Sequence, residues 1–349
     1  MNRTAIDKLR RAIERDKLDA LLVSKPNNVS YLSDFNGEGQ LLITATKQFL
    51  ITDFRYQEDA AKSKKSFELW AREGFSPLEE NIVSLAKKLK LRGLGFESYN
   101  TPYAFYRRLK KALGKKHLIP TSNIIEKIRA VKSPKEIRII RKAASCAVAS
   151  FSFAKNFVKP GKTEEEIAQG IQYFMKKIGA EDKAFDIIVA SGKRASLPHA
   201  YASKKCIKKN DAVLIDLGCR KCGYNSDLTR VVFLGKMWGK IKRIYDIVLR
   251  AQQLAIEAVR AGEQIRTIDK IARQHIANEG FSPFFGHALG HGIGREVHEY
   301  PSISPRNQDR LEAGMVITIE PGIYIPGWGG IRIEDMVLVK KDGSEILTE

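Results

Sequence analysis

The sequence predicts an α+β protein built from two domains. The chain has 349 residues, whereas a single domain usually contains roughly 100–200. Residues 1–125 alternate segments of helical and strand-like apolar spacing, which is typical of an α/β domain. From residue 132 onward, two helix-rich stretches are each followed by strands. We therefore expect an N-terminal α/β domain over 1–125 and a C-terminal domain over 132–349.

The elements of the N-terminal domain follow from local patterns. An amphipathic helix is predicted over residues 6–18, followed by the strand ALLVS. The segments GQLLITA and QFLITD are separated by a short polar turn, which predicts a β-hairpin. Further helices are predicted over 78–91 and 103–113, on either side of the short strand GLGFES.

The C-terminal domain is predicted to be internally duplicated. Helices over 133–178 precede the strands AFDIIVAS and DAVLIDLG, and helices over 240–278 precede strands around Met315 and Ile331. A Ser or Thr followed by an acid marks a helix start, and such pairs occur at Ser133 with Glu136, Thr163 with Glu166 and Thr267 with Asp269. Two helices followed by strands, twice over, indicate two related halves.

Composition limits the compartment and the partners. No stretch has the apolar core of a secretory signal or approaches the ~20 apolar residues that cross a membrane, so we expect a cytoplasmic protein without a membrane partner. Four cysteines are too few for a disulfide scaffold, which fits a reducing compartment. The net charge of +20 suggests nucleic acid, but Lys and Arg alternate with apolar residues as on solvated helix faces. We expect no specific nucleic-acid partner.

Two carboxylates lie on predicted strands in VLIDLGCRKCGYNSDLTRVVFL. A hairpin turn centred between Lys221 and Cys222 would set Asp216 opposite Asp227. Directly opposed residues have Cβ atoms ~4.5–5.5 Å apart, and like charges at that separation are destabilising. A cation between the two side chains would compensate for the repulsion.

A second predicted hairpin repeats this arrangement. IEPGIYI and GIRIEDMVLV flank PGWGG, and a turn centred on Gly327 sets Glu320 opposite Glu334. Any one of these acids can simply point to solvent, because strand alternation sends half of the residues outward. Two such pairs in one domain favour bound cations instead.

Histidines accompany the acidic hairpins. Of six in the chain, His199 lies in ASLPHAYAS, and His287, His291 and His298 lie in FGHALGHGIGREVHEYP. The glycines that would let the backbone approach a site closely are Gly286, Gly290, Gly292 and Gly294. Four carboxylates and an imidazole suit divalent Mn, Co or Fe. Two such ions ~3.5–4 Å apart would activate water, so the chemistry implied is hydrolysis.

These motifs closely resemble the aminopeptidase P and prolidase family, the proline-specific branch of the pita-bread metallopeptidases. LPHA, LIDLGCRKCGYNSDLTR, HALGHGIGREVHE, EAGMVITIEPGIYIP and GIRIEDMVLV stand in the family's order, and NNVSYLSDF with TDFRY resembles its creatinase-like N-terminal domain. The resemblance covers nearly the whole chain. It implies a creatinase-like domain before a pita-bread catalytic domain, cleavage of Xaa-Pro bonds at the N-terminus of short peptides by an aminopeptidase or a dipeptidase, and a homodimer.

The resemblance also implies the metal ligands. Asp216 would chelate one of two divalent ions, Asp227 and Glu334 would bridge both, and His291 and Glu320 would complete the other. Mn or Co is expected, with Fe or Zn as alternatives. A hydroxide bridging the ions would attack the carbonyl before proline.

Further residues are implied on the substrate side. Glu320 would shuttle the proton, His199 and His298 would hold the substrate and the oxyanion, and His287 would line the proline pocket. Ser302 stands where archaeal-type prolidases tend to place an Arg for a dipeptide's carboxylate, which leaves Arg332, Arg295 or Arg306 for that contact. The two cations of SGKRAS either favour acidic peptides or are solvated.

Two other function classes share this fold. A non-catalytic pita-bread binding module typically lacks some ligands, whereas all five are present here. A creatinase-like amidinohydrolase uses the same two domains without metal, and the intact acidic set argues against it. Cys219 and Cys222 form a lone CxxC, for which chance is the simpler explanation.

Overall fold

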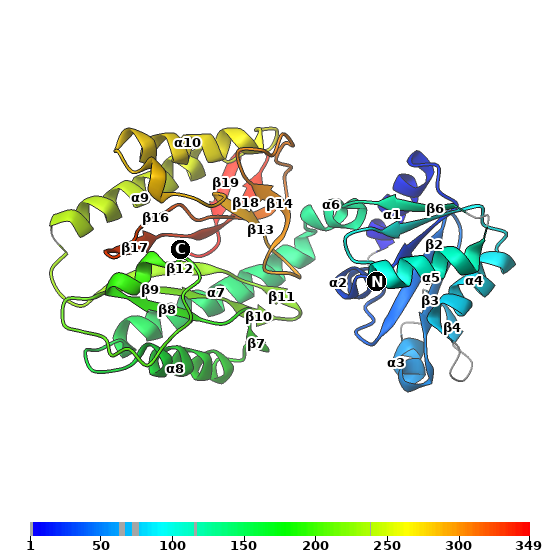
Figure 1. Ribbon diagram of the computed structural model, residues 1–349, viewed down its shortest axis with the longest axis horizontal. Helices are drawn as coiled ribbons and strands as arrows, with labels where there is room; N and C mark the ends of the chain where they lie inside the picture. Colours follow the sequence, from blue (N-terminus) through cyan, green and yellow to red (C-terminus); the bar gives the residue numbers. More distant parts are fainter. Residues whose placement is uncertain (1–2, 63–66, 72–76, 115–116, 238) are drawn as a thin grey trace. The chain divides into compact units, whose positions relative to one another are not determined.

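The structure, a computed structural model, describes residues 3–62, 67–71, 77–114, 117–237 and 239–349. The chain divides into two compact units, Met1–Arg129 and Ala130–Glu349 (Figure 1). Both combine helices with sheets, so the predicted two-domain α+β class is confirmed. None of the helices in the described ranges has both the length and the apolar content needed to cross a bilayer.

The first unit is built around one mixed sheet. Its elements are α1 (Arg3–Arg15), β1 (Ala20–Val23), α2 (Pro26–Ser33), β2 (Gly39–Thr44), β3 (Gln48–Thr52), η1 (Phe54–Tyr56), α3 (Gln57–Lys62), β4 (Glu68–Ala71), α4 (Leu78–Lys88), β5 (Gly93–Glu97), α5 (Tyr103–Leu113), β6 (His117–Thr121) and α6 (Ile124–Ala130). The strand order is β4-β3-β2-β1-β5-β6. The predicted hairpin of β2 and β3 is confirmed. The first helix ends earlier than predicted, at Arg15, because Lys17 adopts a left-handed backbone with φ 54°.

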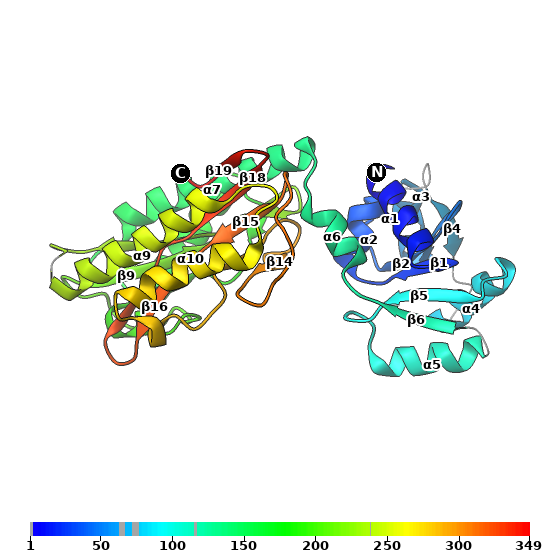
Figure 2. The same ribbon diagram turned by 90° about the horizontal axis from the view of Figure 1, so that it is seen from above.

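Strand alternation divides the apolar residues of this sheet between two cores. Leu21 and Val23 pack with α1, α2 and α6 on one face, whereas Ala20 and Leu22 pack with α4 and α5 on the other. Figure 2 shows α1 and α2 on one side of the strands and α5 on the opposite side. The unit therefore has three layers, and its predicted α/β class is confirmed.

The second unit contains two pairs of long helices and a set of short strands. Its helices are α7 (Pro134–Phe157), α8 (Glu164–Lys177), α9 (Gly239–Ala258) and α10 (Ile265–Asn278), with short helices η2 (Gly192–Ser196) and η3 (Ser282–Phe284). Its strands are β7 (Asp182–Lys183), β8 (Ile188–Ser191), β9 (Ala212–Leu217), β10 (Cys219–Lys221), β11 (Tyr224–Asn225), β12 (Leu228–Phe233), β13 (Gly290–Gly292), β14 (Glu299–Ile303), β15 (Val316–Ile319), β16 (Gly322–Ile325), β17 (Gly329–Arg332), β18 (Asp335–Lys340) and β19 (Gly343–Ile346).

Two of the three predicted helix starts are correct. Ser133 and Thr163 each accept a hydrogen bond from the backbone N–H three residues later, and Glu136 and Glu166 complete capping boxes. The third prediction is wrong, because α10 begins at Ile265 and Gln264 occupies its N-cap without a side-chain bond. Thr267 and Asp269 thus lie inside the helix.

The two hairpins that carry the acids differ in how well their registers were predicted. In the second hairpin, Ile319 pairs with Asp335 and Gly322 pairs with Arg332, so Glu320 and Glu334 lie opposite each other in register as expected. In the first hairpin, Asp216 pairs with Thr229 and not with Asp227. The turn lies at Cys222 and Gly223, which both have positive φ angles of 48° and 72°. This is the backbone of a type I′ turn, shifted one residue from the predicted centre.

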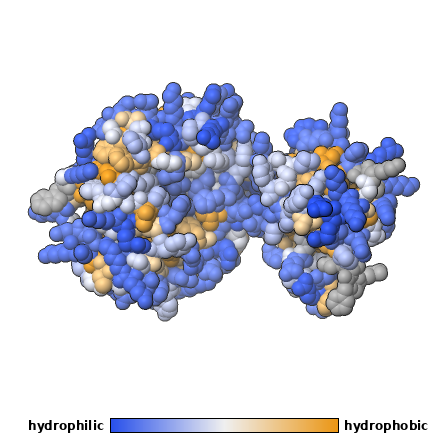
Figure 3. Space-filling model, viewed as in Figure 1, coloured by the Kyte–Doolittle hydropathy of each residue, from blue (hydrophilic) through white to orange (hydrophobic). Residues whose placement is uncertain are grey.

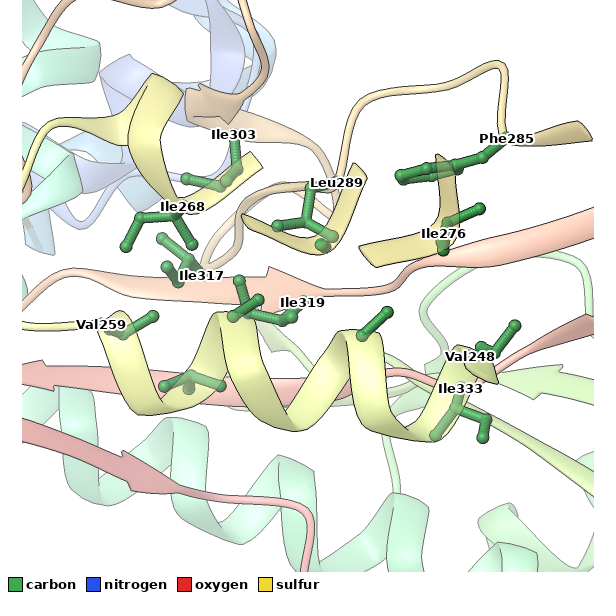
Figure 4. Close-up of a cluster of buried hydrophobic side chains, with 14 of the residues drawn as sticks. Val248, Val259, Ile268, Ile276, Phe285, Leu289, Ile303, Ile317, Ile319 and Ile333 are labelled. Carbon is green, nitrogen blue, oxygen red and sulfur yellow. The ribbon is translucent and has the colours of Figure 1, made fainter. Parts of the chain in front are cut away.

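The strands of this unit lie between the two helix pairs. Figure 1 shows α9 and α10 on one side of the strands and α8 on the other. Apolar residues of β15 and β17–β18, including Ile317, Ile319 and Ile333, pack against Val248 and Val259 of the α9 region (Figure 4). On the face shown in Figure 3, hydrophilic residues cover most of the surface, which fits the interpretation of the positive charge as solvated helix faces.

Candidate active site

The four predicted acids converge on one buried site. Asp216 lies on β9, Asp227 directly precedes β12, Glu320 directly follows β15 and Glu334 directly precedes β18. Ile319 and Ile333 point into the α9 and α10 core, so alternation turns the two adjacent glutamates to the opposite side. Asp227 and Glu334 are 5% and 2% exposed.

The four carboxylates are close enough to shift one another's pKa values. Burial raises the pKa of Asp227 well above its usual range, and Glu334, Asp216 and Glu320 raise it further. Burial, followed by Glu320 and Asp216, does the same for the pKa of Glu334. Burial raises the pKa of Glu320 to about 8, with Asp216 contributing. Such mutual repulsion in a buried site needs a compensating positive charge.

His291 faces the same carboxylates. Its Nε2 lies 3.3 Å from Glu320 Oε1 and 3.7 Å from Asp227 Oδ2. Its Nδ1 lies 3.1 Å from the carbonyl oxygen of Gly292, which assigns the proton to Nδ1. Burial lowers the pKa of His291 to about 3, so the ring is neutral. Its Nε2 lone pair therefore points at carboxylate oxygens, an arrangement that a cation between them would make favourable.

The donor set fits metal ions. The ligand atoms of Asp227, His291 and Glu334 all lie within 4.8 Å of one another. Among the described residues, Asp216 Oδ1 and Glu334 Oε1 are buried side-chain oxygens without a hydrogen-bond partner. Buried oxygens without a partner are rare and need a compensating ligand. Carboxylates with one imidazole are the donor set of hard divalent cations.

Arg332 is the main positive charge beside the acids. Its Nη2 donates to Asp216 Oδ2 at 2.6 Å, its Nε donates to Thr229 Oγ1, and its Nη1 donates to Tyr324 Oη at 2.9 Å and to the carbonyl oxygen of Pro198 at 3.2 Å. The residue is 4% exposed. Four of its five N–H donors thus face protein atoms, and contact between Arg332 and a substrate carboxylate stays a prediction.

Three further histidines surround the site. His298 stacks edge to face on His291 with ring centroids 4.2 Å apart. His199 is exposed and lowers the pKa of both His287 and His298, although burial is the first cause in each case. His287 donates from Nδ1 to the carbonyl oxygen of Ala288, which leaves Nε2 to accept from Tyr324 Oη at 3.1 Å. All the histidines predicted for the site thus lie within electrostatic reach of it.

Three residues at this site were not predicted. Thr229 donates to Glu334 Oε2 at 2.7 Å, Tyr324 connects His287 with Arg332, and Thr318 donates to Glu320 and accepts from the His291 backbone N–H. Thr229 is two residues after Asp227. Thr318 is two residues before Glu320, and Tyr324 is four residues after it. Because alternate residues share a face, this spacing is the signal that could have identified them.

The expectation that glycines allow close approach is correct in part. A Cβ on Gly290 would lie 2.0 Å from the Thr318 carbonyl oxygen, and one on Gly292 would lie 2.3 Å from that of Tyr300. A Cβ on Gly294 would lie 2.6 Å from Glu299 Oε1, but Gly286 faces open space. The residues of the lone CxxC differ in environment, because Cys219 is buried and Cys222 is exposed.

In the metal-free protein, we expect the free energy of unfolding to fall as the pH rises from 7 to 8. Glu320 keeps its proton up to about pH 8 when folded, but its ordinary pKa is 4.5, so the folded chain binds more protons over this interval. The loss should be on the order of 1 kcal/mol per pH unit. Urea denaturation in the presence of a chelator would measure it.

The interval is chosen to exclude the histidines. Burial lowers the pKa values of His287 and His291 to about 4 and about 3. These two histidines therefore make stability rise with pH, opposite to the effect of the carboxylates, but only below their ordinary pKa of 6.5. The variant Glu320→Gln should show a flatter slope, and saturating metal should remove it. A metal-free wild type whose stability falls no more steeply between pH 7 and 8 than that of Glu320→Gln would contradict this account.

An α/β unit is followed along the chain by a duplicated unit that holds acids from both of its halves. These features define the protein class as a two-domain metal-dependent hydrolase of the pita-bread fold. Comparison with known families agrees. Residues 138–341 match the Metallopeptidase family M24, and residues 6–131 match the Creatinase/Prolidase N-terminal domain. The chain belongs to this metallopeptidase family, which implies divalent metal ions, and the resemblance seen in the sequence is confirmed.

Similar proteins extend over the whole chain. An Xaa-Pro dipeptidase from Pyrococcus horikoshii is 41% identical over 347 residues, which cover 99% of this chain and 96% of that protein. The solved structure of an Xaa-Pro dipeptidase from Bacillus anthracis matches with a TM-score of 0.95 and 40% identity, covering 99% of this chain and 97% of that one. An X-Pro aminopeptidase from Thermotoga maritima matches with a TM-score of 0.87 and 37% identity, covering 98% of each chain.

Proposed function

We propose that the protein hydrolyses the bond between an N-terminal residue and proline in short peptides. The observation that carries this proposal is the convergence of Asp216, Asp227, His291, Glu320 and Glu334 on one buried site. Similar proteins named Xaa-Pro dipeptidase and X-Pro aminopeptidase support the proline specificity.

The five residues would hold two divalent ions. Asp216 would bind one ion, His291 and Glu320 the other, and Asp227 and Glu334 both. Mn or Co suits this oxygen-rich set, with Fe or Zn as alternatives. When bound, the ions supply an activated water at neutral pH and polarise the peptide carbonyl.

The remaining chemistry belongs to side chains around the ligands. The bond before proline is a tertiary amide, so its leaving nitrogen has no N–H and must gain a proton. Glu320 would take a proton from the attacking water and deliver it to that nitrogen. His199 and His298 would donate to the carbonyl oxygen as it becomes negative, and one such preorganised donor is typically worth ~2.7–4 kcal/mol.

An aromatic surface would receive the proline ring. The ring centroids of Phe285 and Tyr324 lie 5.1 Å and 5.5 Å from that of His287. Burial lowers the pKa of His287 to about 4, so its imidazole is neutral near neutral pH. Aromatic rings suit contact with the apolar pyrrolidine ring. We propose in addition that the protein is a homodimer that accepts short peptides only.

A substrate comparison tests the proposed function. Protein freed of metal by a chelator would be assayed on Gly-Pro, Arg-Pro-Pro and Met-Ala-Ser, before and after addition of Mn or Co. We expect metal to restore cleavage of Gly-Pro, which indicates a dipeptidase, or of Arg-Pro-Pro, which indicates an aminopeptidase. Cleavage of Met-Ala-Ser alone would refute the proline specificity. No cleavage by protein with two ions bound would favour the non-catalytic binding module.

A further inference from the structure

Three of the site's four histidines, His199, His287 and His298, are not proposed metal ligands, and they share a structural feature. Each lies on a segment that is attached to a buried acid paired with a basic residue. The pairs are Glu164 with Arg194 near His199, Asp269 with Arg273 near His287, and Glu299 with Lys132 near His298. The side chains of the three acids are 0%, 0% and 3% exposed. Buried ion pairs are poor sources of stability, so their repeated position beside the site needs another explanation.

Glu164 makes an extensive set of contacts. It is the first residue of α8. Its carboxylate accepts hydrogen bonds from both ends of residues 191–203, which we call the His199 segment. Oε1 accepts from Ser191 N at 2.9 Å and from Ser191 Oγ at 2.8 Å. Oε2 accepts from Arg194 Nε at 2.9 Å and from Ser203 Oγ at 2.6 Å. One carboxylate therefore fixes residues 191 and 203 at the two ends of the segment.

Arginines hold the backbone on either side of His199. Arg194 Nη2 donates to the carbonyl oxygen of Tyr201, two residues after the histidine. Arg332 Nη1 donates to the carbonyl oxygen of Pro198, the residue directly before it, at 3.2 Å. The position of His199 is thus connected both to Glu164 and, through Arg332, to Asp216.

The His199 segment has little apolar anchoring of its own. Leu197, His199 and Tyr201 are exposed, and the buried side chains near them are those of Ala195 and Ala200. The segment lies on the backbone of β17, where a Cβ on Gly330 would come within 2.2 Å of the Ala195 carbonyl oxygen. Ala195 and Ala200 pack in a small apolar cluster with Ala190 and Leu214, and the polar contacts of Glu164 hold the two ends of the segment.

We infer that Glu164, together with Arg194, is a positioning residue that sets the location of the His199 imidazole for the reaction. This inference rests on the proposed function, in which His199 contacts the substrate carbonyl. The inference also gives a role to Arg194 of the SGKRAS stretch. Its guanidinium donates to Glu164 and to the Tyr201 carbonyl oxygen, so it helps to position His199.

The variant Glu164→Gln tests the inference with a minimal change of shape. A Gln amide presents an NH2 group where one carboxylate oxygen stood, opposite the donors of Ser191 or of Arg194 and Ser203. Those donors then lose their acceptor, and the segment must shift. Misplacement of a contact residue by about 1 Å can lower turnover by up to roughly 100-fold. We expect kcat to fall by about 10-fold and KM to change by less than about 3-fold.

A second readout does not depend on activity. The chain has six histidines, so the Cε1–H signals of the full-length, zinc-loaded protein can be observed individually by NMR. The signal that disappears in His199→Gln identifies His199. In Glu164→Gln this signal should shift or broaden, while that of His117 on β6 should not move. The matched control is Glu257→Gln, the same chemical change at an exposed ion pair on α9, which should alter neither kcat nor the His199 signal.

Arg194→Met provides a variant that does not depend on tolerance of a buried change, since Arg194 is partly exposed. It removes the contacts to Glu164 and to Tyr201, and it should reproduce the loss of kcat and the shift of the His199 signal. Lower thermal stability of Glu164→Gln with kcat and the His199 signal unchanged would overturn the inference, as would a shifted signal with kcat unchanged. If the wild type cleaves no Xaa-Pro peptide, the proposed function fails, but the NMR comparison still decides whether Glu164 places His199.

Discussion

Glu334→Gln should lose most of the metal-dependent activity and, at the same time, make the metal-free protein more stable. The loss follows from the proposed role of Glu334 as a ligand to both ions. Replacing residues that merely support ligands lowers metal affinity or activity by roughly 10–100-fold, so we expect the loss of a shared ligand to exceed roughly 100-fold.

The gain in stability has a different cause. Glu334 is 2% exposed, and burial together with Glu320 and Asp216 raises its pKa well above the usual range. Gln removes the carboxylate, whose ionisation is unfavourable in this site, and its amide oxygen can still accept the hydrogen bond from Thr229 Oγ1. Stability at pH 8 in chelator should therefore increase by about 1 kcal/mol or more, since one pKa unit corresponds to about 1.4 kcal/mol.

Activity assays, metal analysis and urea denaturation test both parts. Glu257→Gln is the control, because its glutamate is exposed on α9. A Glu334→Gln protein that binds as much metal as the wild type would contradict the assignment of Glu334 as a ligand. A metal-free variant less stable than the wild type would contradict the account of charge repulsion.

Arg332→Met should destabilise the metal-free protein by about 3–5 kcal/mol, the usual consequence of removing one partner of a buried ion pair. Arg332 carries the positive charge beside these acids. Its Nη2 contacts Asp216, and its Nε lies 4.0 Å from Glu320 Oε2. Its removal leaves buried carboxylates without a countercharge. The loss should be much smaller in metal-loaded protein, because bound cations then balance the same acids.

Thermal denaturation with and without Mn would measure this difference. The stabilisation by metal should be larger in Arg332→Met than in the wild type. Arg332→Lys keeps the charge but not the forked donors, so its stabilisation by metal should lie between those of Arg332→Met and the wild type. Arg250→Met is the control at an exposed arginine and should change stability by about 0.5 kcal/mol or less. Equal destabilisation by Arg332→Met with and without metal would refute the countercharge role.

The sequence predicted best what depends on local spacing. The register of the hairpin carrying Glu320 and Glu334 was correct because PGWGG marks its turn clearly. The register of the first hairpin was wrong by one turn position. Gly223 was the overlooked signal, since a type I′ turn favours Gly at its second central residue. Even so, Asp216 and Asp227 reach one site. Asp227 is two residues from Thr229, the partner of Asp216, and residues two apart on a strand share a face.

Contacts between distant segments could not be predicted in this way. Arg332 is 116 residues from Asp216, and Glu164 is 27 residues from Ser191. No periodicity within a strand or helix encodes such pairings. The ion pairs that fix the His199 and His287 segments depend on how α8 and α10 pack against the strands, which only the folded chain specifies.

The division of the acids between the two halves of the second unit has a mechanical consequence. Asp216 and Asp227 come before α9, and Glu320 and Glu334 come after α10. An ion held by acids of both halves is a cross-link between segments that are far apart along the chain. Like a disulfide, such a link restricts the freedom of the chain, but a chelator can remove it. The atoms proposed to set up hydrolysis would thus also hold the duplicated halves together, and both properties would be lost in one step.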